Sequence, residues 1–341
     1  MEKILMHHRS SHHAQNSGYG KLMDYLEAEI LPSGKKHLPY SIAKYISQKA
    51  SPQAGLYEST SVPKDWELIR HLLLSNNKDR IIHYLNGERD IRYAMKVASL
   101  FSKTKVCATF HKPPEILSTT IQDTRYLKKL DAAITVGVNQ VDFIQNWLNL
   151  ENVKFIPHGI DTAFFRPDAS KRKENTLLFV GQHLRDFEAL NYAIPRLKEQ
   201  IPSIKINAVL RSDFANKIVS NDAVTIFSGI DDERLRAMYQ EAALLFLPLK
   251  NGTACNSILE AMACGLPIIS TDIGGNKGYV KTDSGVLVPS NDCKALVDET
   301  VCLLKDKSKQ IQMSEKARSN SLEFEWEKVA VEIEAFYNEI I

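Results

Sequence analysis

The sequence predicts an α/β protein with two similar domains, each built on a parallel β-sheet with helices on both faces. A chain of 341 residues is long enough for two domains. Its composition, 44% hydrophobic and 25% charged, is typical of globular proteins and excludes a disordered or fibrous chain. Short β-branched or apolar runs alternate with helical patterns along the whole length, which is the pattern of a sheet wound on both faces.

The predicted strands form two sets of five. The first set is 3–7, 80–85, 105–110, 132–136 and 154–156. The second set is 176–180, 205–210, 224–227, 244–248 and 267–270. No close sequence repeat relates the two sets, so the predicted similarity is one of architecture.

A turn-rich connection separates the two sets. Pro and Gly residues between positions 157 and 167 interrupt both ladders and helices. We therefore expect a first domain of residues 1–160 and a second domain of residues 161–323. A final helix over 324–341 has apolar residues at helical spacing and is expected to cross back onto the first domain.

The net charge of +2 is the sum of two oppositely charged halves. Residues 1–157 carry 21 Lys and Arg against 15 Asp and Glu, whereas residues 158–341 carry 22 against 26. The basic half, which also holds eight of the ten His residues, suits an anionic surface or ligand. Its charge falls far short of a nucleic-acid-binding composition, so no nucleic-acid partner is expected.

Neither a signal peptide nor a membrane-spanning helix is predicted. The N-terminal apolar run is too short for a signal-peptide core, and no stretch approaches 18 continuous apolar residues. A soluble, cytoplasmic protein is expected. The five cysteines form no Cys-x-x-Cys pair and are odd in number, which favours reduced, buried thiols. Cys255 and Cys264 in particular are expected to be packing residues.

The segment 247–267 is the most informative about chemistry. A strand ends at Pro248, small and polar residues follow, and a helix is expected to begin at Asn256 or Ser257. Its first N–H groups would lie at the carboxyl edge of the sheet, where α/β domains bind phosphates. Glu260 is placed to accept hydrogen bonds from ribose hydroxyls; the alternative is a carboxylate that the helix dipole favours.

This segment resembles the donor-site signature of nucleotide-sugar glycosyltransferases with the GT-B fold, specifically the retaining family 4. Other stretches resemble the family in the same order: 155–161, 165–167, 178–181 and 266–275. The resemblance covers nearly all of the second half, and the first half resembles the family in layout. It implies two Rossmann-like domains that face each other across a cleft, the first binding the acceptor and the second the nucleotide-sugar donor.

The resemblance implies a retaining hexosyltransferase. Such an enzyme moves a sugar from a UDP- or GDP-sugar to a hydroxyl of a saccharide, a lipid-linked acceptor or a protein glycan, in polysaccharide, glycolipid or glycoconjugate synthesis. The leaving phosphate would act near the attacking hydroxyl, so no pair of catalytic carboxylates is needed. Neither a bound cofactor nor a metal is expected, because GT-B enzymes use helix dipoles and basic side chains.

The resemblance also implies donor-site residues, with one departure from the family. Glu260 matches the second glutamate of the family's E-x7-E pattern, which binds the donor ribose, but Gly252 occupies the position of the first. Polar contacts to the donor are therefore expected from the small side chains nearby: Asn251, Thr253, Asn256 and Ser257.

A second departure follows Gly181, where the family has an Arg and then a Lys on the donor diphosphate and this chain has a Gln next. Arg185 and Arg211 are the candidate cations, and Arg185 is also assigned to catalysis, because a diphosphate leaving group needs nearby positive charge. The alternative for Arg185 is an ion pair with Asp186 or Glu188.

In the first domain, the loop after the first strand occupies the position of the family's Gly-rich loop. Gly18 and Gly20 would let the backbone approach the donor closely, and His12 and His13 are expected on the acceptor side. Four histidines within seven residues suggest a metal site. The loop has no Asp or Glu, however, and no functional metal is expected.

Two further loops of the first domain hold candidate residues. His111 follows the third predicted strand, where related enzymes place a histidine near the transferred sugar, and it is assigned to catalysis. The alternative is a capping or core-edge histidine. Asn86, Glu88 and Arg89 are candidate acceptor contacts, with exposed salt bridges as the alternative.

Other functions remain open. Gly252 and Gln182 favour a catalytically altered protein that binds a sugar nucleotide without transferring the sugar, and an epimerase of similar architecture is a third interpretation. Residues 38–49 mix aromatic, aliphatic and lysine side chains. They would either rest on the inner face of an anionic membrane, near a lipid-linked acceptor, or pack as an ordinary helix.

Overall fold

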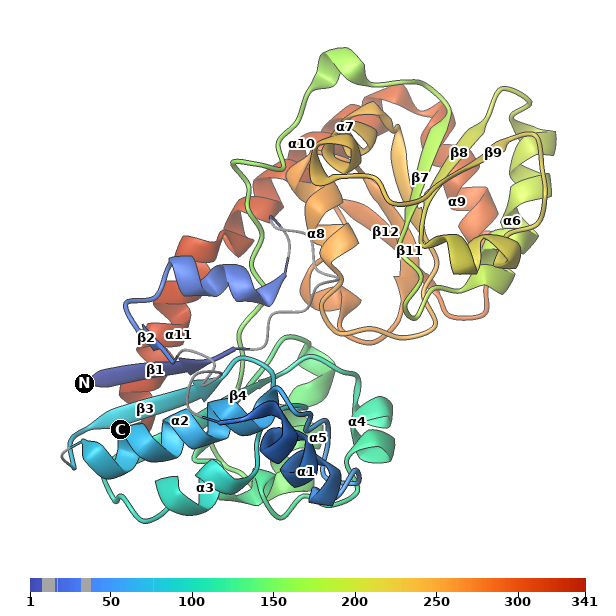
Figure 1. Cartoon of the computed structure of the whole chain (residues 1–341). Helices are drawn as coiled ribbons and strands as arrows, with labels where there is room; N and C mark the ends of the chain where they lie inside the picture. The colour runs from blue at the N-terminus through green and yellow to red at the C-terminus, as the bar shows by residue number, and fades with distance from the viewer. Residues whose placement is uncertain (8–15, 17, 32–37, 76) are drawn as a thin grey trace. The chain divides into compact units, whose positions relative to one another are not determined.

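The structure is a computed structural model that describes residues 1–7, 16, 18–31, 38–75 and 77–341. The chain folds into two compact units, whose elements are labelled in Figure 1. The N-terminal unit contains the first strand, residues 19–157 and residues 329–341, and the C-terminal unit contains residues 158–328 together with the described residues Asn16 and Gly18. Each unit has its own sheet and its own hydrophobic core.

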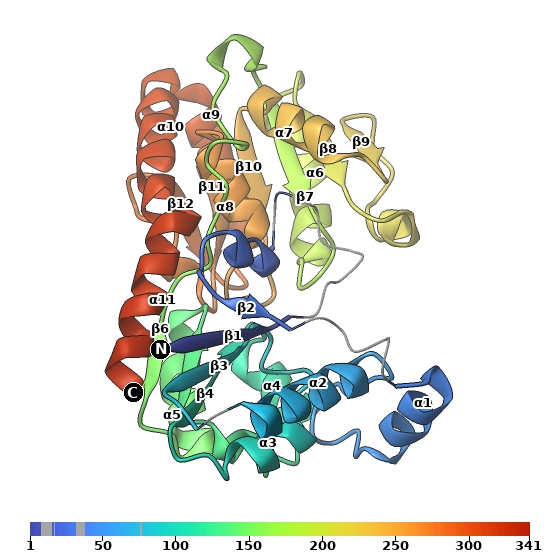
Figure 2. The ribbon, with the colours of Figure 1, turned by 60° about the vertical axis from the view of Figure 1, so that its left-hand side comes forward.

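The N-terminal unit is built on a parallel sheet in the order β2-β1-β3-β4-β5-β6. Its strands are β1 (Glu2–Met6), β2 (Glu29–Ile30), β3 (Arg80–Tyr84), β4 (Thr104–Phe110), β5 (Ala132–Thr135) and β6 (Val153–Phe155). Its helices are α1 (Tyr40–Lys49), α2 (Ser61–Leu74), α3 (Tyr93–Ala98), α4 (Pro114–Thr120), α5 (Val141–Leu148) and most of α11 (Trp326–Ile340). Figures 1 and 2 show α2 and α3 on one side of this sheet and α11 on the other.

Helices on both faces explain why the central strands β3 and β4 are buried along almost their whole length. Every residue of β3 is buried. Ile82 and Tyr84 pack in one core with residues of α2 and α3. The alternate residue His83 lies on the opposite face, where its Nδ1 is 2.6 Å from the hydroxyl of Tyr337 in α11.

His83 joins three elements of the N-terminal unit. Its second ring nitrogen, Nε2, is 2.7 Å from Oγ1 of Thr109 in β4. Burial, and then the neighbouring His111, lower the pKa of His83 to about 3. The neutral imidazole therefore satisfies two buried hydroxyls without bringing a charge into the core.

The C-terminal unit is built on a second parallel sheet in the order β12-β11-β10-β7-β8-β9. Its strands are β7 (Thr176–Val180), β8 (Lys205–Val209), β9 (Val224–Phe227), β10 (Leu244–Leu247), β11 (Ile268–Asp272) and β12 (Gly285–Pro289). Its helices are α6 (Phe187–Gln200), α7 (Asp232–Glu241), α8 (Asn256–Ala263), α9 (Cys293–Lys305) and α10 (Lys307–Ser321). Helix α6 packs against α9, and α8 packs against α7 and α10.

The predicted α/β class is confirmed, and all ten predicted strands are present with ends within two residues of the prediction. Two strands, β2 and β12, were not predicted. The helix expected at Asn256 or Ser257 begins at Asn256. Cys255 and Cys264 are buried as expected, but the expectation of buried thiols is wrong for Cys302, which is exposed on α9. Among the described residues, no helix combines the length and apolar character needed to cross a membrane.

Candidate functional site

Two loops of the C-terminal unit meet where the strand order of its sheet reverses, between β7 and β10. These are the loops 181–186 and 248–255. Arg185 and Leu249 form an isolated antiparallel bridge between them, and the N–H of Asp186 donates to the carbonyl of Pro248 at 2.9 Å. In doubly wound sheets, ligands bind at the carboxyl ends of the strands at such a switch point.

Arg185 is held at the beginning of α8. Its Nε donates to the carbonyl of Val180 at 2.8 Å, its Nη1 to that of His183 at 3.0 Å, and its Nη2 to Oγ of Ser257 at 3.2 Å. Gly181 has φ of +88°, and a Cβ there would lie 2.8 Å from Nη2 of Arg185. The turn after β7 therefore requires glycine both for its conformation and for the space that the guanidinium fills.

The alternative partners of Arg185 are engaged elsewhere. Oδ1 of Asp186 caps α6 by accepting from the N–H groups of Glu188 and Ala189, at 3.1 and 3.0 Å. Glu188 pairs with Lys250 at 3.0 Å. The described ion pairs include neither carboxylate with Arg185, so the guanidinium keeps its positive charge uncompensated by those two neighbours.

Ser257 and Glu260 are three residues apart on α8 and therefore lie on one side of it. Both are buried. Oε2 of Glu260 accepts a hydrogen bond of 2.7 Å from the hydroxyl of Tyr239 in α7. Burial, and then the charge of Glu260, raise the pKa of Tyr239 well above its ordinary value, so this hydroxyl remains a donor. Glu260 is the fifth residue of α8 and lies beyond its first turn.

Gly252 lies in a loop whose backbone packs directly against the loop after β11. Its carbonyl accepts from the N–H of Gly275 at 3.1 Å, and a Cβ at Gly274, which has φ of +57°, would collide with that carbonyl. A Cβ at Gly252 itself would meet its nearest atom, Oδ1 of Asn276, at 3.8 Å. Space for a side chain thus exists at Gly252. Thr253 is buried and Asn256 half-buried beside it.

Arg211 lies on an exposed turn after β8 and is paired with Asp213 through both carboxylate oxygens. The hydrogen bonds to Asp213 raise the pKa of Arg211, and the same bonds lower the pKa of Asp213. The positive charge of Arg211 is therefore largely compensated within its own turn.

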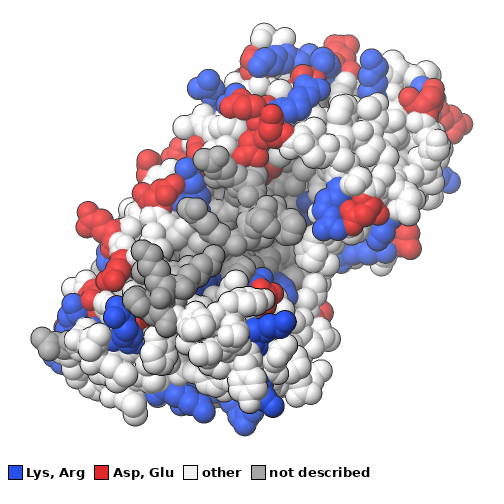
Figure 3. Space-filling model, in the orientation of Figure 1, with Lys and Arg blue, Asp and Glu red and all other residues white. Residues whose placement is uncertain are grey.

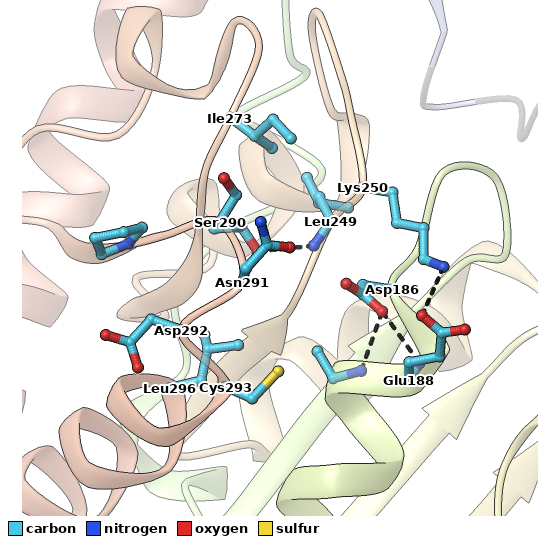
Figure 4. Close-up of a pocket in the computed structure, with 13 residues that line it drawn as sticks. Asp186, Glu188, Leu249, Lys250, Ile273, Ser290, Asn291, Asp292, Cys293 and Leu296 are labelled. Carbon is cyan, nitrogen blue, oxygen red and sulfur yellow. Dashed lines mark hydrogen bonds and ion pairs between the residues drawn. The ribbon is translucent and has the colours of Figure 1, made fainter.

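A cavity of about 300 Å³ lies at the carboxyl ends of β10, β11 and β12, beside the first residues of α6 and α9 (Figure 4). Its lining includes Asp186, Glu188 and Asp292 against a single cation, Lys250, which pairs with Glu188. Arg185, Ser257 and Glu260 are not among the lining residues. An excess of carboxylates makes this cavity a poor site for a diphosphate, and no motif in the sequence predicts it.

In the N-terminal unit, His111 is tied to the loop after β3. Oε1 of Glu88 accepts from the backbone N–H groups of His111 and Lys112, at 2.6 and 2.8 Å. Nε2 of His111 is 2.8 Å from the carbonyl of Leu85, and the Tyr19 ring meets the imidazole edge-on at a centroid distance of 4.7 Å. Glu88, expected as an acceptor contact, is 2% exposed and is occupied with this backbone.

The other expected residues of this unit lie outside its strands. Arg89 pairs with the half-exposed Glu58 at 3.2 Å, and Asn86 is half-buried in the same loop. A Cβ at Gly20 would lie 2.9 Å from the imidazole of His7, so the chain passes close to that ring. Gly18, which groups with the C-terminal unit, has φ of +122°, which favours glycine. His12 and His13 lie outside the described residues.

A buried cluster around Asp65 of α2 was missed by sequence reasoning. Its carboxylate accepts from the hydroxyl of Tyr57 at 2.7 Å and from the N–H groups of Tyr93 and Ala94 at 2.9 and 3.2 Å. Burial outweighs these hydrogen bonds and raises the pKa of Asp65 to about 7. The carboxyl thereby joins α2 to the first turn of α3.

Among the described residues, one group of three could in principle hold a metal: Glu2, Glu29 and His71. Glu2 is also paired with Lys78 at 2.9 Å and with Arg80. Although burial raises the pKa of Glu2, these two cations lower it to about 2. The cluster is thus an ion-pair network that already balances the carboxylate.

The structure therefore brings Arg185, Ser257 and Glu260 together in the C-terminal unit, and leaves Arg211 with its own partner. Residues 161–320 match the family model described as glycosyl transferases group 1. The match covers most of the C-terminal unit.

Two curated relatives have sequences similar to this chain. The D-inositol 3-phosphate glycosyltransferase of Xylanimonas cellulosilytica is 26% identical over 208 residues, which are 53% of this chain and 50% of that protein. The phosphatidyl-myo-inositol mannosyltransferase of Propionibacterium freudenreichii is 23% identical over 246 residues, which are 68% and 63%. The chain thus spans between half and two thirds of these relatives.

A solved structure has a similar fold over the whole chain. HepE from Anabaena, crystallised in complex with UDP and glucose, has a TM-score of 0.69 at 13% identity and covers 99% of this chain and 100% of its own. The GT-B fold implied by the sequence is confirmed, with two six-stranded parallel sheets and C-terminal helices.

Proposed function

We propose that the protein is a retaining glycosyltransferase that moves a hexose from a nucleoside-diphosphate sugar to a hydroxyl acceptor. The observation that carries this proposal is the contact of Arg185 with Ser257 at the first turn of α8, one turn before the buried carboxylate of Glu260. A fixed cation and a helix N-terminus suit a diphosphate, and a carboxylate suits ribose hydroxyls. This site lies within the stretch that matches the group 1 glycosyl transferases.

The donor site divides into parts for the two ends of the nucleotide sugar. Three of the five N–H groups of Arg185 are committed to the protein, which leaves two for phosphate oxygens. Ser257 lies at the same helix end, and Glu260 binds the ribose. At the sugar end, Thr253 and Asn256 replace the carboxylate that Gly252 does not supply.

Catalysis would rest on positioning and charge stabilisation. Arg185 stabilises the negative charge that grows on the departing diphosphate, and His111 of the N-terminal unit contacts the sugar or the acceptor hydroxyl. The leaving phosphate accepts the proton of the attacking hydroxyl on the same face, which accounts for retention. None of these steps requires a metal.

The rival function is a protein that binds a sugar nucleotide without transferring the sugar, and Gly252 is the observation that favours it. A thermal-shift screen of nucleosides, nucleoside diphosphates and nucleotide sugars identifies the base and sugar, because a ligand that binds the native state raises the melting temperature. Release of nucleoside diphosphate from the stabilising donor, with a panel of hydroxyl acceptors, then separates the two functions. Binding without release in every combination would exclude transfer.

The acceptor is proposed to lie at an anionic membrane. In α1, Tyr40, Ile42 and Tyr45 are between 46% and 70% exposed, and the helix carries two lysines and no acidic residue. Figure 3 shows this part of the N-terminal unit as mostly uncharged surface with basic side chains at its margin. Sedimentation with vesicles of anionic and of zwitterionic lipid tests the proposal, and lack of binding to anionic vesicles at low salt excludes it.

A further inference from the structure

The cavity in the C-terminal unit combines a buried floor with a polar rim (Figure 4). Its floor includes Leu249, Thr271 and Leu296, each at most 5% exposed. Its rim is formed by the start of α6 on one side and by residues 289–293, which end in the first residue of α9, on the other. A volume of about 300 Å³ is at the lower end of the range for small-molecule sites.

The charges around the cavity have partners of their own. Oδ1 of Asp186 caps α6, and Oδ1 of Asp292 caps α9 by accepting from the N–H of Ala295 at 2.9 Å. A helix N-terminus compensates the charge of such a carboxylate, and Glu188 pairs with Lys250. The cavity therefore needs no counter-ion, and among the described residues its carboxylates form no group close enough to hold a metal.

Two carboxylate oxygens remain as hydrogen-bond acceptors. Oδ2 of Asp186 and Oδ2 of Asp292 have no partner among the residues that the structure describes. Burial, and then the charges of Asp186 and Asp292, raise the pKa of Cys293, which lines the cavity from the first turn of α9. Both carboxylates thus lie near the lining, where a ligand can donate to them.

Thr271 adds a buried donor at the floor. Its Oγ1 accepts from the N–H of Leu249 at 3.0 Å, and no described residue accepts its own O–H. The side chain is 5% exposed, and a buried donor without an acceptor destabilises the protein. A ligand oxygen at the floor of the cavity would accept this hydrogen bond.

A fitting ligand must supply an acceptor to the floor, donors to the rim and an apolar surface to Leu249, Ile273 and Leu296. Hydroxyl groups both donate and accept, and a sugar ring also presents C–H groups to aliphatic side chains. The excess of carboxylates disfavours an anion, and an ammonium group has no acceptor for the O–H of Thr271. A neutral saccharide meets all three requirements.

The cavity shares residues with the two loops that hold Arg185. Leu249, whose N–H is bound by Thr271, forms the isolated bridge with Arg185. Asp186 directly follows Arg185, and its N–H donates to the carbonyl of Pro248. A ligand that contacts Asp186, Leu249 and Thr271 therefore restrains the backbone on which the guanidinium is fixed.

We propose that this cavity binds a neutral mono- or disaccharide, and that the bound saccharide raises the affinity of the donor site by restraining the loop of Arg185. Saccharide binding is independent of the proposed function. The effect on the donor site rests on the proposed function, which assigns the diphosphate to Arg185.

Alkylation of Cys293 in the full-length protein measures occupancy of the cavity. Cys302 is exposed on the same helix and is not a lining residue, so it serves as the internal reference. Labelling by iodoacetamide is followed by mass spectrometry with D-glucose, D-mannose, N-acetyl-D-glucosamine, maltose or sucrose present. A saccharide at about ten times its dissociation constant should slow the labelling of Cys293 by about 10-fold and leave Cys302 unchanged.

Paired variants test whether the saccharide binds in the cavity. T271V removes the donor at the floor and D292N replaces the free oxygen at the rim with an amide, and each should weaken saccharide binding by about 3- to 10-fold. T271S keeps the hydroxyl and should bind as the wild type does, even where T271V loses stability. The controls are T300V and D306N, which change a buried threonine and a helix cap of the same unit outside the lining.

The saccharide site is overturned if none of these saccharides slows the labelling of Cys293 relative to Cys302, or if T271V and D292N bind as tightly as the wild type. Protection by inorganic phosphate or putrescine, without protection by any saccharide, also overturns it, because the cavity would then select charge.

Titration of UDP and GDP with and without the protecting saccharide tests the effect on the donor site. The saccharide should tighten binding of the diphosphate by about fivefold or more, and T271V should lose this effect. An unchanged affinity in the wild type overturns the link. If neither diphosphate binds at all, the proposed function fails and the link fails with it, while the labelling of Cys293 still decides the saccharide site.

Discussion

The replacement of Arg185 by glutamine tests the donor site most directly. Arg185 bridges the turn after β7 and the first turn of α8 through three hydrogen bonds, and two of its N–H groups remain for a ligand. Glutamine removes the charge and the planar fork. Lysine keeps the charge and loses the fork, so R185K separates the two contributions.

The expected magnitude follows from the hydrogen bonds that the substitution removes. A hydrogen bond to a charged group contributes about 1.5–3 kcal/mol, which corresponds to about 12- to 160-fold in a dissociation constant. If glutamine forms one fewer hydrogen bond to the diphosphate than arginine does, R185Q should bind its nucleoside diphosphate weaker by that factor. R185K should fall between R185Q and the wild type.

Isothermal titration with UDP and GDP at fixed ionic strength measures this effect. The control is R196Q, which removes an exposed arginine that stacks on Tyr192 at 3.6 Å in the same unit, and it should change binding by less than about twofold. R211Q should also have a small effect, because Asp213 already compensates Arg211.

One outcome would refute the reasoning. If R185Q melts at the wild-type temperature and binds both diphosphates within about twofold of the wild type, the guanidinium does not contact the phosphates. If R211Q binds the diphosphates much more weakly while R185Q binds them as the wild type does, the diphosphate site lies at the turn after β8 instead.

Three further predictions concern stability. Folding raises the pKa of Asp65 from 3.8 to about 7, so the native state binds the proton of this carboxyl more tightly than the unfolded state does. The free energy of unfolding should therefore fall as pH rises from about 4 to about 7, by at most about 4 kcal/mol. Urea unfolding of D65N should lack this pH dependence, and a slope equal to that of the wild type would contradict the prediction. A Cβ at Gly159 would collide with the buried Trp326 ring, so G159A should lose about 1–3 kcal/mol in thermal unfolding, whereas an unchanged melting temperature would show that the ring yields freely. Y239F leaves the buried carboxylate of Glu260 without its 2.7 Å donor and should cost about 1.5–3 kcal/mol in urea unfolding; a loss below about 0.5 kcal/mol would mean that Glu260 finds another donor.

The strands were predictable because their cause is local. Runs such as Thr176–Val180 and Leu244–Leu247 are buried at every position, as strands covered on both faces must be. The bounds of α8 were predictable from local signals as well. Small polar residues precede its first residue, and Gly265 with φ of +63° follows its end. Of the two missed strands, β2 has only two residues, and β12 begins at a glycine and ends at a proline, which together indicate a loop.

The site contacts depend on sheet order, which the sequence does not display. Arg185 and Ser257 are 72 positions apart and meet because β7 lies next to β10. Glu88 was expected to face the acceptor because it follows a strand. It turns instead toward the neighbouring strand end and binds the backbone at His111. No local pattern around Tyr239 signals the partner that the fold gives it.

The hydrogen bond between His83 and Tyr337 also has a consequence for biosynthesis. Residues 158–328 of the C-terminal unit form one continuous stretch of chain, so they leave the ribosome before the helix that completes the other unit. Until residues 329–341 emerge, the face of β3 and β4 that carries His83 and Thr109 lacks its cover. The N-terminal unit is therefore synthesised first but completes its folding last. A chain halted near position 328 would contain a folded C-terminal unit and an N-terminal sheet with one face uncovered. Chaperones bind such partly folded chains, which also aggregate readily.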